Sequence, residues 1–490
     1  MSKEPDGISR PIGALGADHS RRLKRKGGTM HRFAAVDGDA GKAGITSSGR
    51  RRRVGALGGA LACLAAAFAV ASTVGETAAA SPQDAGKVVF FSNQLAQVSE
   101  VNQVRNTLLK GFNGDVDYIV PPVGQPQVFF NRVEAEAKAG RGSISLLGAL
   151  HGDYLVIQKY LRDLTPVANQ LKKAGIPKDL MTLGKLGTKR QLYIPWMQAT
   201  YIMVANRKAL PYLPKGANVN ALTYGQFQQW AKNISEKTGQ KRVAFPAGTN
   251  GLIPRFFEGY LVPSFSGGVV TTFKSNGAVN GWKYMRSIWR YVHPQSLSYN
   301  FMQDPLQSGE VWVAWDHVAR LVNALKSKPG DYVAFPAPKG PKGRGYMPVL
   351  AGLAVPKTAP NASGGQALIR WMTGKATQAR TLGSVGFFPV VGARYSKQLG
   401  QGLLKMNAAV SKAQRSKDAL KSLLPVGLGA EGGNFNKVYT DTFVRIVVKG
   451  ENIQKVLNDE ATQLQAIMDK TGAPCWAPDP SSHGRPCKVR

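Results

Sequence analysis

Short apolar strands alternate with helical segments after residue 86, and this alternation restricts the fold more than any other feature of the chain. Strands are predicted at residues 87–92, 116–120 and 143–147, with helices at 99–112 and 129–137 between them. Because the strands are apolar almost throughout, helices must cover both faces of their sheet. The order strand, helix, strand, helix, strand therefore predicts an α/β fold with a parallel sheet.

The same alternation continues through the middle of the chain. Further strands are predicted at 193–196, 200–205, 311–315, 332–336 and 353–356, and further helices at 223–237, 283–291 and 365–372. At roughly 100–200 residues per domain, a chain of 490 residues makes two or three globular units. The sequence has no internal repeat, no P-loop and no G-x-S-x-G or H-E-x-x-H motif. We therefore expect no catalytic residues, no metal and no cofactor.

The first 80 residues differ in composition from the rest. Residues 1–53 are polar and basic and are predicted to be a disordered leader, whereas residues 54–74 carry no charge. With Ala78, Ala79 and Ala80 they make a signal peptide region and cleavage site at 54–80. The protein is therefore expected outside the cytoplasm, at the cell surface or secreted. An uncleaved anchor at 54–74, lipidation at Cys63 and a start at Met30 stay open as alternatives.

Positive charge is the strongest bias in the composition, with a net charge of +35 for the whole chain. Residues 81–490 hold 51 basic and 23 acidic side chains, which leaves a net charge of +28. These charges occur singly and in pairs along the chain, which is typical of a solvated surface. Since an exported protein rarely meets nucleic acid, an anionic cell wall or membrane is the expected counterpart, and no nucleic-acid partner is predicted.

Two cysteines remain after the leader, Cys475 and Cys487, in a Pro-rich tail at 471–490. In an exported chain such a pair predicts one disulfide that closes a short loop. The loop-entropy account gives it about 3 kcal/mol of stability. A metal site would need more ligands than His483 adds.

Polar side chains follow two of the predicted strands. Ser92 and Asn93 come at the end of the first strand, and His151 and Asp153 follow the third. Ligands of parallel sheets bind at the carboxyl ends of the strands, so these four residues are predicted ligand contacts. The alternatives are that Ser92 and Asn93 cap the following helix and that His151 has a structural role in its loop.

Nine short segments follow one another in order between residues 87 and 390. They are KVVFFS at 87–92, YLRDLT at 160–165, QLYIPW at 191–196 continued by YIMVAN at 201–206, TYGQF at 223–227, GEVWVAW at 309–315, FPAPKGP at 335–341, GLAVP at 352–356, the helix at 368–378 and GFFPV at 386–390. Together they resemble the extracellular solute-binding proteins of ABC importers, in the sugar-binding branch that is similar to maltose-binding protein. Tyr224 stands where that family usually has Trp.

The resemblance implies a two-lobed, periplasmic-binding-protein-like (type II) α/β fold with hinge strands and an interlobe cleft. Lobe one is expected at 87–197 plus 349–388 and lobe two at 198–348 plus 389–470, with crossings near 197–201, 349–353 and 387–391. A member of this family is a monomer that closes over a solute, performs no chemistry and passes the solute to a membrane permease.

A sugar presents hydroxyl groups at its edges and apolar faces, so aromatic rings beside polar groups are the expected lining of the cleft. Trp315 ends a predicted strand, Asp316 and His317 follow it, and Trp315 with Asp316 is the strongest pair of candidates. Trp196 and Phe387 lie at expected crossings, and Gly352 on another crossing leaves room for a ligand. For both tryptophans, packing in the core is the alternative.

Other functions stay open beside capture of a mono- or oligosaccharide. An anionic or phosphorylated solute fits the same fold. An exported hydrolase or a cell-wall-associated protein belongs to a different class, and paired carboxylates with perturbed pKa values in the cleft would favour the hydrolase. The sequence does not identify the sugar or the permease.

Overall fold

The computed structural model describes residues 84–122, 125–391 and 400–490. One part of the molecule is built around a six-stranded mixed sheet. Its strand order is β11-β4-β10-β3-β1-β2. The strands are β1 (Lys87–Ser92), β2 (Asp115–Ile119), β3 (Leu146–Leu150), β4 (Ile194–Ala199), β10 (Val349–Ala354) and β11 (Phe388–Pro389). β1 pairs in parallel with β2 and β3, and β10 is antiparallel to β3 and β4. The predicted parallel unit at 87–147 is therefore confirmed, and late strands extend it.

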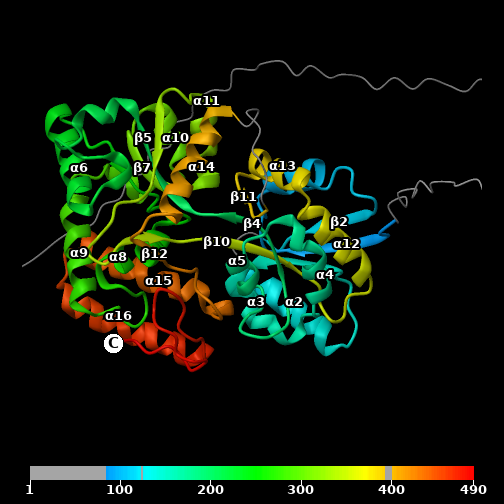
Figure 1. Ribbon diagram of the computed structural model, residues 1–490. Helices are drawn as coiled ribbons and strands as arrows, with labels where there is room; N and C mark the ends of the chain where they lie inside the picture. The colour runs from blue at the N-terminus through cyan, green and yellow to red at the C-terminus, as the bar shows by residue number, and fades with distance from the viewer. Residues whose placement is uncertain (1–83, 123–124, 392–399) are drawn as a thin grey trace, which may run out of the picture. The chain divides into compact units, whose positions relative to one another are not determined.

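Helices surround this sheet, as its apolar strands require (Figure 1). α3 packs against β3 and β10, and α12 packs against β1 and β3. The helices of this part are α1 (Val98–Gln103), α2 (Pro126–Lys138), α3 (His151–Ile157), α4 (Thr165–Gln170), α5 (Lys178–Leu183), α12 (Ala362–Met372) and α13 (Lys375–Val385). A π-helical turn, η1 (Val104–Leu108), continues α1, so the helix predicted at 99–112 is two shorter segments.

A second sheet of four strands has the order β6-β7-β5-β8. Its strands are β5 (Tyr201–Asn206), β6 (Val243–Ala244), β7 (Val313–His317) and β8 (Tyr332–Phe335). β5 lies antiparallel between β7 and β8. The accompanying helices are α6 (Tyr224–Thr238), α7 (Ile253–Phe256), α8 (Val262–Ser266), α9 (Asn276–Trp289), α10 (Gln303–Ser308), α11 (Val322–Ser327), α14 (Gly400–Gln414), α15 (Gly432–Phe443) and α16 (Ile453–Thr471). β9 (Arg344–Tyr346) and β12 (Ala419–Lys421) form a separate parallel pair.

The chain passes from the first sheet to the second at Thr200, between β4 and β5. The Thr200 hydroxyl donates to the carbonyl oxygen of Met347 at 2.8 Å, and the Tyr260 hydroxyl accepts from the backbone N–H of Tyr201 at 3.2 Å. Met347 itself lies two residues before β10. These bonds join the two segments that connect the sheets. The predicted limits of the two lobes stay a prediction.

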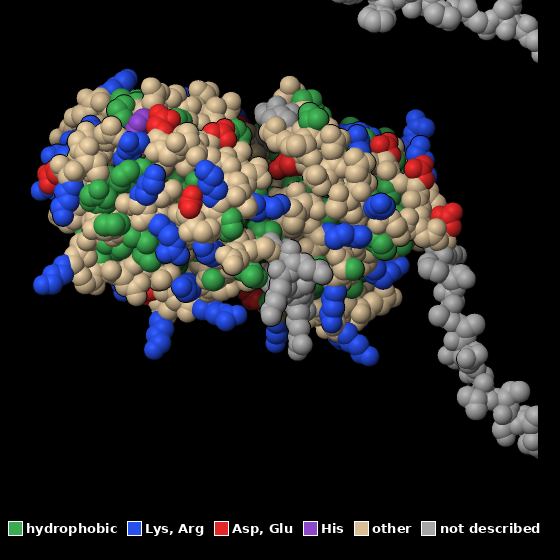
Figure 2. All heavy atoms as spheres, turned by 90° about the horizontal axis from the view of Figure 1, so that it is seen from above, with side chains coloured by type: hydrophobic (Ala, Val, Ile, Leu, Met, Phe, Trp, Pro, Cys, Tyr) green, Lys and Arg blue, Asp and Glu red, His purple; other side chains and the backbone are tan. Residues whose placement is uncertain are grey.

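None of the helices in residues 84–122, 125–391 and 400–490 is long and apolar enough to cross a bilayer. The signal region at 54–80, Cys63 and Met30 lie outside the described residues. Over the face seen in Figure 2, Lys and Arg side chains outnumber Asp and Glu and are spread singly across the surface. On this face the positive charge is therefore spread over the surface, as the sequence predicts.

The C-terminal tail contains a disulfide and also forms hydrogen bonds with residues 269–271. The predicted bond between Cys475 and Cys487 is present. Inside the loop it closes, the buried Asp479 carboxylate accepts backbone N–H groups from Val269, Val270 and Thr271 at 2.9–3.0 Å. The Gly267-Gly268 turn lies directly before these residues.

Replacing Asp479 by Ala is expected to lower the free energy of unfolding by roughly 3 kcal/mol, because three backbone N–H groups lose a charged acceptor in a buried place. Urea denaturation measures the loss. The matched control is Asp469→Ala, since Asp469 pairs with Lys488 at the exposed surface and such pairs contribute about 0–1 kcal/mol. Equal losses in the two variants would contradict the role assigned to Asp479.

Candidate ligand-binding site

A cavity of about 700 Å³ opens where loops of the two sheets meet. From the first sheet its wall consists of the segment after β1, Val349 and the end of α13 with Phe387; from the second it consists of Tyr201, Leu252, Phe301, Gln303 and the segment after β7. The cavity is thus lined by residues that are far apart in the sequence, such as Asn93 and Phe387.

The segment after β1 is held in place by its own polar groups. The Asn93 amide donates to the Asp153 carboxylate at 3.0 Å, and the Leu150 backbone N–H donates to the same oxygen at 3.2 Å. Burial raises the pKa of Asp153, and these hydrogen bonds oppose that rise. Ser92 is buried, and its hydroxyl accepts from the backbone N–H of Gln94 at 3.0 Å. Asn93 therefore lines the cavity, while Ser92 and Asp153 support the loop behind it.

Amide side chains dominate the polar part of the lining. There are six of them: Asn93, Gln94, Gln97, Gln103, Gln303 and Asn323. Glu100 is the one carboxylate and Arg320 the one guanidinium among the lining residues. Burial raises the pKa of Glu100, and its hydrogen bond to Gln97 and the charge of Arg320 oppose that rise. The cavity is therefore balanced in charge although the whole chain carries +35.

Tyr201 is the aromatic ring of the second sheet that lines the cavity. It is the first residue of β5, its side chain is 4% exposed, and its ring stacks on Trp315 with centroids 4.8 Å apart. His317 pairs with Tyr201 across the strands, and its ring lies 5.1 Å from the Tyr201 ring and 5.4 Å from the Phe387 ring. Burial lowers the pKa of His317 to about 3, so the imidazole is neutral near pH 7.

The structure changes the role expected for Trp315 and Asp316. Both are fully buried, and neither is among the residues that line the cavity. Asp316 accepts backbone N–H groups from Met302 at 3.0 Å and from His317 at 2.7 Å, and burial raises its pKa to about 7. The physical reason is that β7 continues two residues past the predicted end, so His317 occupies the strand end and Tyr201 covers Trp315.

Three other candidates also lie behind the cavity wall. Trp196 is buried in the first sheet, in keeping with the core alternative. His151 Nδ1 lies 2.8 Å from the Tyr193 hydroxyl, and burial lowers its pKa to about 4. Gly352 leaves room for the Tyr193 ring, because a Cβ at this position would lie 2.1 Å from that ring. Of the predicted contacts, Asn93 and Phe387 line the cavity, and ligand contact by any of the nine stays a prediction.

Comparison with known proteins finds similarity to one family. Residues 148–379, just under half of the 490 residues, match the family model of the bacterial extracellular solute-binding proteins. This part of the chain is similar to that family. Its members are receptors for solutes and not enzymes, which agrees with the absence of catalytic motifs. Comparison with curated protein sequences gives no match.

Solved structures confirm the fold of this solute-binding protein. Maltose-bound MalE3 of T. maritima has a TM-score of 0.62 and 17% identity, over 78% of this chain and 100% of that one. The GacH receptor of Streptomyces glaucescens, solved with and without acarbose, has a TM-score of 0.60 and 17% identity, over 78% and 98%. UgpB of Mycobacterium tuberculosis, in complex with glycerophosphocholine, has a TM-score of 0.59 and 16% identity, over 79% and 99%. The predicted two-lobed α/β fold is confirmed by these similarities.

A buried ion pair lies beside the cavity of this solute-binding protein. Arg255 Nη1 and Glu258 Oε2 are 2.6 Å apart, the Glu258 side chain is 1% exposed, and its other oxygen has no hydrogen-bond partner. Burial raises the pKa of Glu258, and the charge of Arg255 opposes that rise. The same guanidinium opposes the rise that burial causes in the pKa values of Tyr201 and Asp153. The charge of Arg255 therefore acts on Tyr201, which lines the cavity, and on Asp153, which supports the loop after β1.

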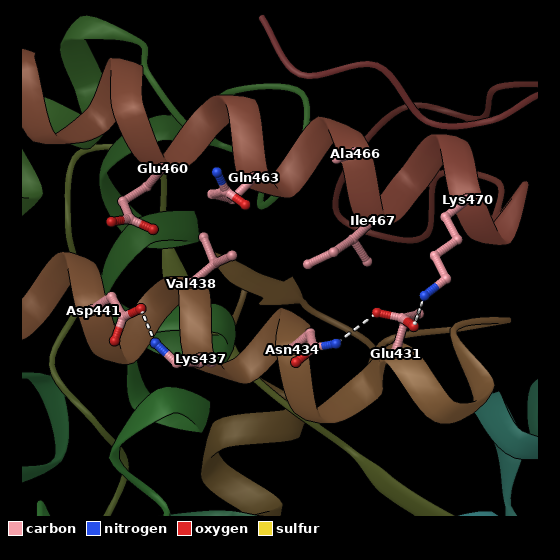
Figure 3. Close-up of a pocket in the computed structure, with 10 residues that line it drawn as sticks. All are labelled: Glu431, Asn434, Lys437, Val438, Asp441, Glu460, Gln463, Ala466, Ile467 and Lys470. Atoms are coloured by element: carbon pink, nitrogen blue, oxygen red, sulfur yellow. Dashed lines mark hydrogen bonds and ion pairs between the residues drawn. The ribbon is translucent and has the colours of Figure 1, made fainter.

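A second hollow, of about 530 Å³, lies between α15 and α16 (Figure 3). Most of its charged side chains pair with one another: Lys437 with Asp441, and Glu431 with Lys470 at 2.6 Å and with Asn434 at 2.7 Å. Glu460 pairs with Arg445 at 3.0 Å, and no aromatic ring lines the hollow. Since its charged groups are already paired, the cavity between the sheets is the stronger candidate. The described residues also contain no group of three or more His, Cys, Asp or Glu that could hold a metal.

Proposed function

We propose that this solute-binding protein captures an uncharged carbohydrate in the cavity between its two sheets. One observation carries the proposal: six amide side chains and three aromatic rings line the cavity, with only one carboxylate and one guanidinium among them. Amides donate to and accept from hydroxyl groups, and aromatic rings cover the apolar faces of a sugar ring. This combination suits a neutral polyhydroxylated ligand.

The charge balance argues against an anionic solute. Lys and Arg side chains are abundant on the surface seen in Figure 2. Cationic side chains would therefore be available if the protein bound an anion. Yet Arg320 is the only cationic side chain in the lining, and Glu100 shares the cavity with it. The similar structures are crystallised with maltose, acarbose and glycerophosphocholine. The first two support the carbohydrate, and the third is the reason to keep a phosphorylated solute in the test.

The remaining parts of the proposal follow from the family and the fold. The lobes at 87–197 plus 349–388 and at 198–348 plus 389–470 would close over the ligand by movement at the connecting segments. The closed protein, a monomer without a nucleic-acid partner, would deliver the sugar to the permease of an ABC importer. Its place would be outside the cytoplasm, reached through the export signal.

A thermal-shift panel tests the proposed function. Purified protein is heated with neutral mono- and oligosaccharides, with phosphorylated sugars and glycerophosphocholine, and with peptides. A ligand at 100 times its dissociation constant adds roughly 2.7 kcal/mol to stability, which raises the midpoint by a few degrees. We expect shifts from neutral sugars. Shifts confined to the anions or the peptides would overturn the proposal, and release of a cleaved sugar would indicate an enzyme.

A further inference from the structure

Phe301 is an aromatic ring that lines the cavity and yet stays open to solvent. Its side chain is 43% exposed, in contrast to 4% for Tyr201. The Arg320 guanidinium lies over the ring, with its central carbon 4.4 Å from the ring centroid. Arg320 is itself held in place, because Nη1 donates to the Asn300 carbonyl oxygen at 2.9 Å. The ring is therefore fixed against a cation while much of its surface remains uncovered.

The two aromatic rings Tyr201 and Phe301 thus differ in how deeply they lie in the cavity. Tyr201 is packed between Trp315 and His317 and belongs to the inner wall. Phe301 precedes α10 and belongs to the outer part of the same cavity, where solvent reaches it. Apolar surface is therefore available in the outer part of the cavity, at Phe301, as well as at its inner end.

The volume of the cavity exceeds the need of a single sugar ring. At roughly 30 Å³ per water molecule in the liquid, 700 Å³ corresponds to about 23 molecules. Bonded atoms pack more closely than separate water molecules, so a lone hexose, with about 12 non-hydrogen atoms, would leave most of this space to water. The cavity therefore has room for at least two rings, one at each depth.

On the basis of the proposed function, we propose that Phe301 is the stacking surface of an outer subsite and that the ligand is an oligosaccharide of at least two rings. The inner ring packs against Tyr201 and forms hydrogen bonds with the amides after β1. The outer ring lies on Phe301, where its C–H face replaces solvent over an aromatic surface that Arg320 keeps in position. The additional affinity of the longer ligand then depends on Phe301.

Calorimetric titrations of the full-length protein with three series of sugars of increasing length test this inference. The probes are glucose, mannose and galactose, each with its α- and β-linked di- and trisaccharides. The variants are wild type, Phe301→Ala and Leu297→Ala. Leu297 is the matched control because its side chain is 45% exposed near Phe301 in sequence and does not line the cavity. The thermal midpoint of each variant reports whether it is folded.

We expect a disaccharide to bind the wild type at least tenfold more tightly than its monosaccharide. In Phe301→Ala this gain should shrink to threefold or less, while the affinity for the monosaccharide changes less than twofold. Leu297→Ala should behave as the wild type. Equal affinity for the mono- and disaccharide, or an equal loss for both in Phe301→Ala, would overturn the outer subsite and leave the proposed function standing. Failure of all the sugars to bind the wild type would overturn both.

Discussion

The free energy of unfolding should fall by about 3–5 kcal/mol when Arg255 is replaced by Met, because the change leaves a buried carboxylate without its cation. The Glu258 side chain is 1% exposed and has Arg255 as its ion-pair partner at 2.6 Å. One of its oxygens already lacks a hydrogen-bond partner. Urea denaturation at pH 8 measures the loss.

The loss in Arg255→Met should depend on pH. Burial already raises the pKa of Glu258 above its ordinary value, and removal of Arg255 raises it further. The folded state then binds more protons than the unfolded state above the unfolded pKa of Glu, about 4.3. Stability should therefore increase as the pH falls from 8 toward 5. A pH-independent loss would contradict this account.

Two further variants separate the charge from the packing around Arg255. Adding Glu258→Gln to Arg255→Met removes the buried charge, so the double variant should recover most of the stability lost at pH 8. Lys232→Met is the matched control, because Lys232 faces Glu236 at the exposed surface and should change stability by less than about 1 kcal/mol.

Sugar affinity should fall about 30- to 100-fold when Tyr201 is replaced by Ala, a loss of roughly 2–3 kcal/mol. The ring lines the cavity and is held between Trp315 and His317, so its removal takes away the inner stacking surface. Calorimetry with the sugar that gives the largest thermal shift measures the change. The Tm of the variant shows whether it is folded.

Tyr201→Phe keeps the ring and serves as the matched control. Its affinity should stay within about fivefold of the wild type if stacking is the main contribution. An equal loss in both variants would assign the effect to the hydroxyl group. Wild-type affinity in Tyr201→Ala would remove Tyr201 from the site altogether.

The alternation of apolar strands and helices was enough to predict the α/β class, because each strand depends mainly on its own residues, whereas the two-lobed arrangement followed from the resemblance to the family. The first strand has the predicted limits, Lys87–Ser92. The ends of strands depend on partners far along the chain. β7 continues through Asp316 and His317 because Ile202 and Tyr201 pair with them, and this pairing cannot be read from the apolar segment 311–315. Trp315, which was predicted to contact the ligand, therefore lies in the core.

The sequence predicted that Gly352 leaves space beside its strand, but not which group fills that space. Gly352 does leave space, and the Tyr193 ring occupies it. The same limit applies to the C-terminal tail. Two cysteines predict their own disulfide, but the partners of Asp479 lie about 210 residues earlier in the chain. Tyr201 was not among the predicted contacts, although it was part of a segment that resembled the family, and its position at the end of the predicted crossing 197–201 is the signal that could have pointed to the cavity.

Hydrogen exchange of the protein with and without the best-binding neutral sugar shows whether the sugar binds in the cavity between the two sheets. Exchange slows where a ligand orders or covers the backbone. We predict protection at residues 93–103, after β1, and at residues 317–323, after β7, so that both walls of the cavity respond together. Protection confined to α15 and α16, around the hollow in Figure 3, would contradict a sugar site between the two sheets.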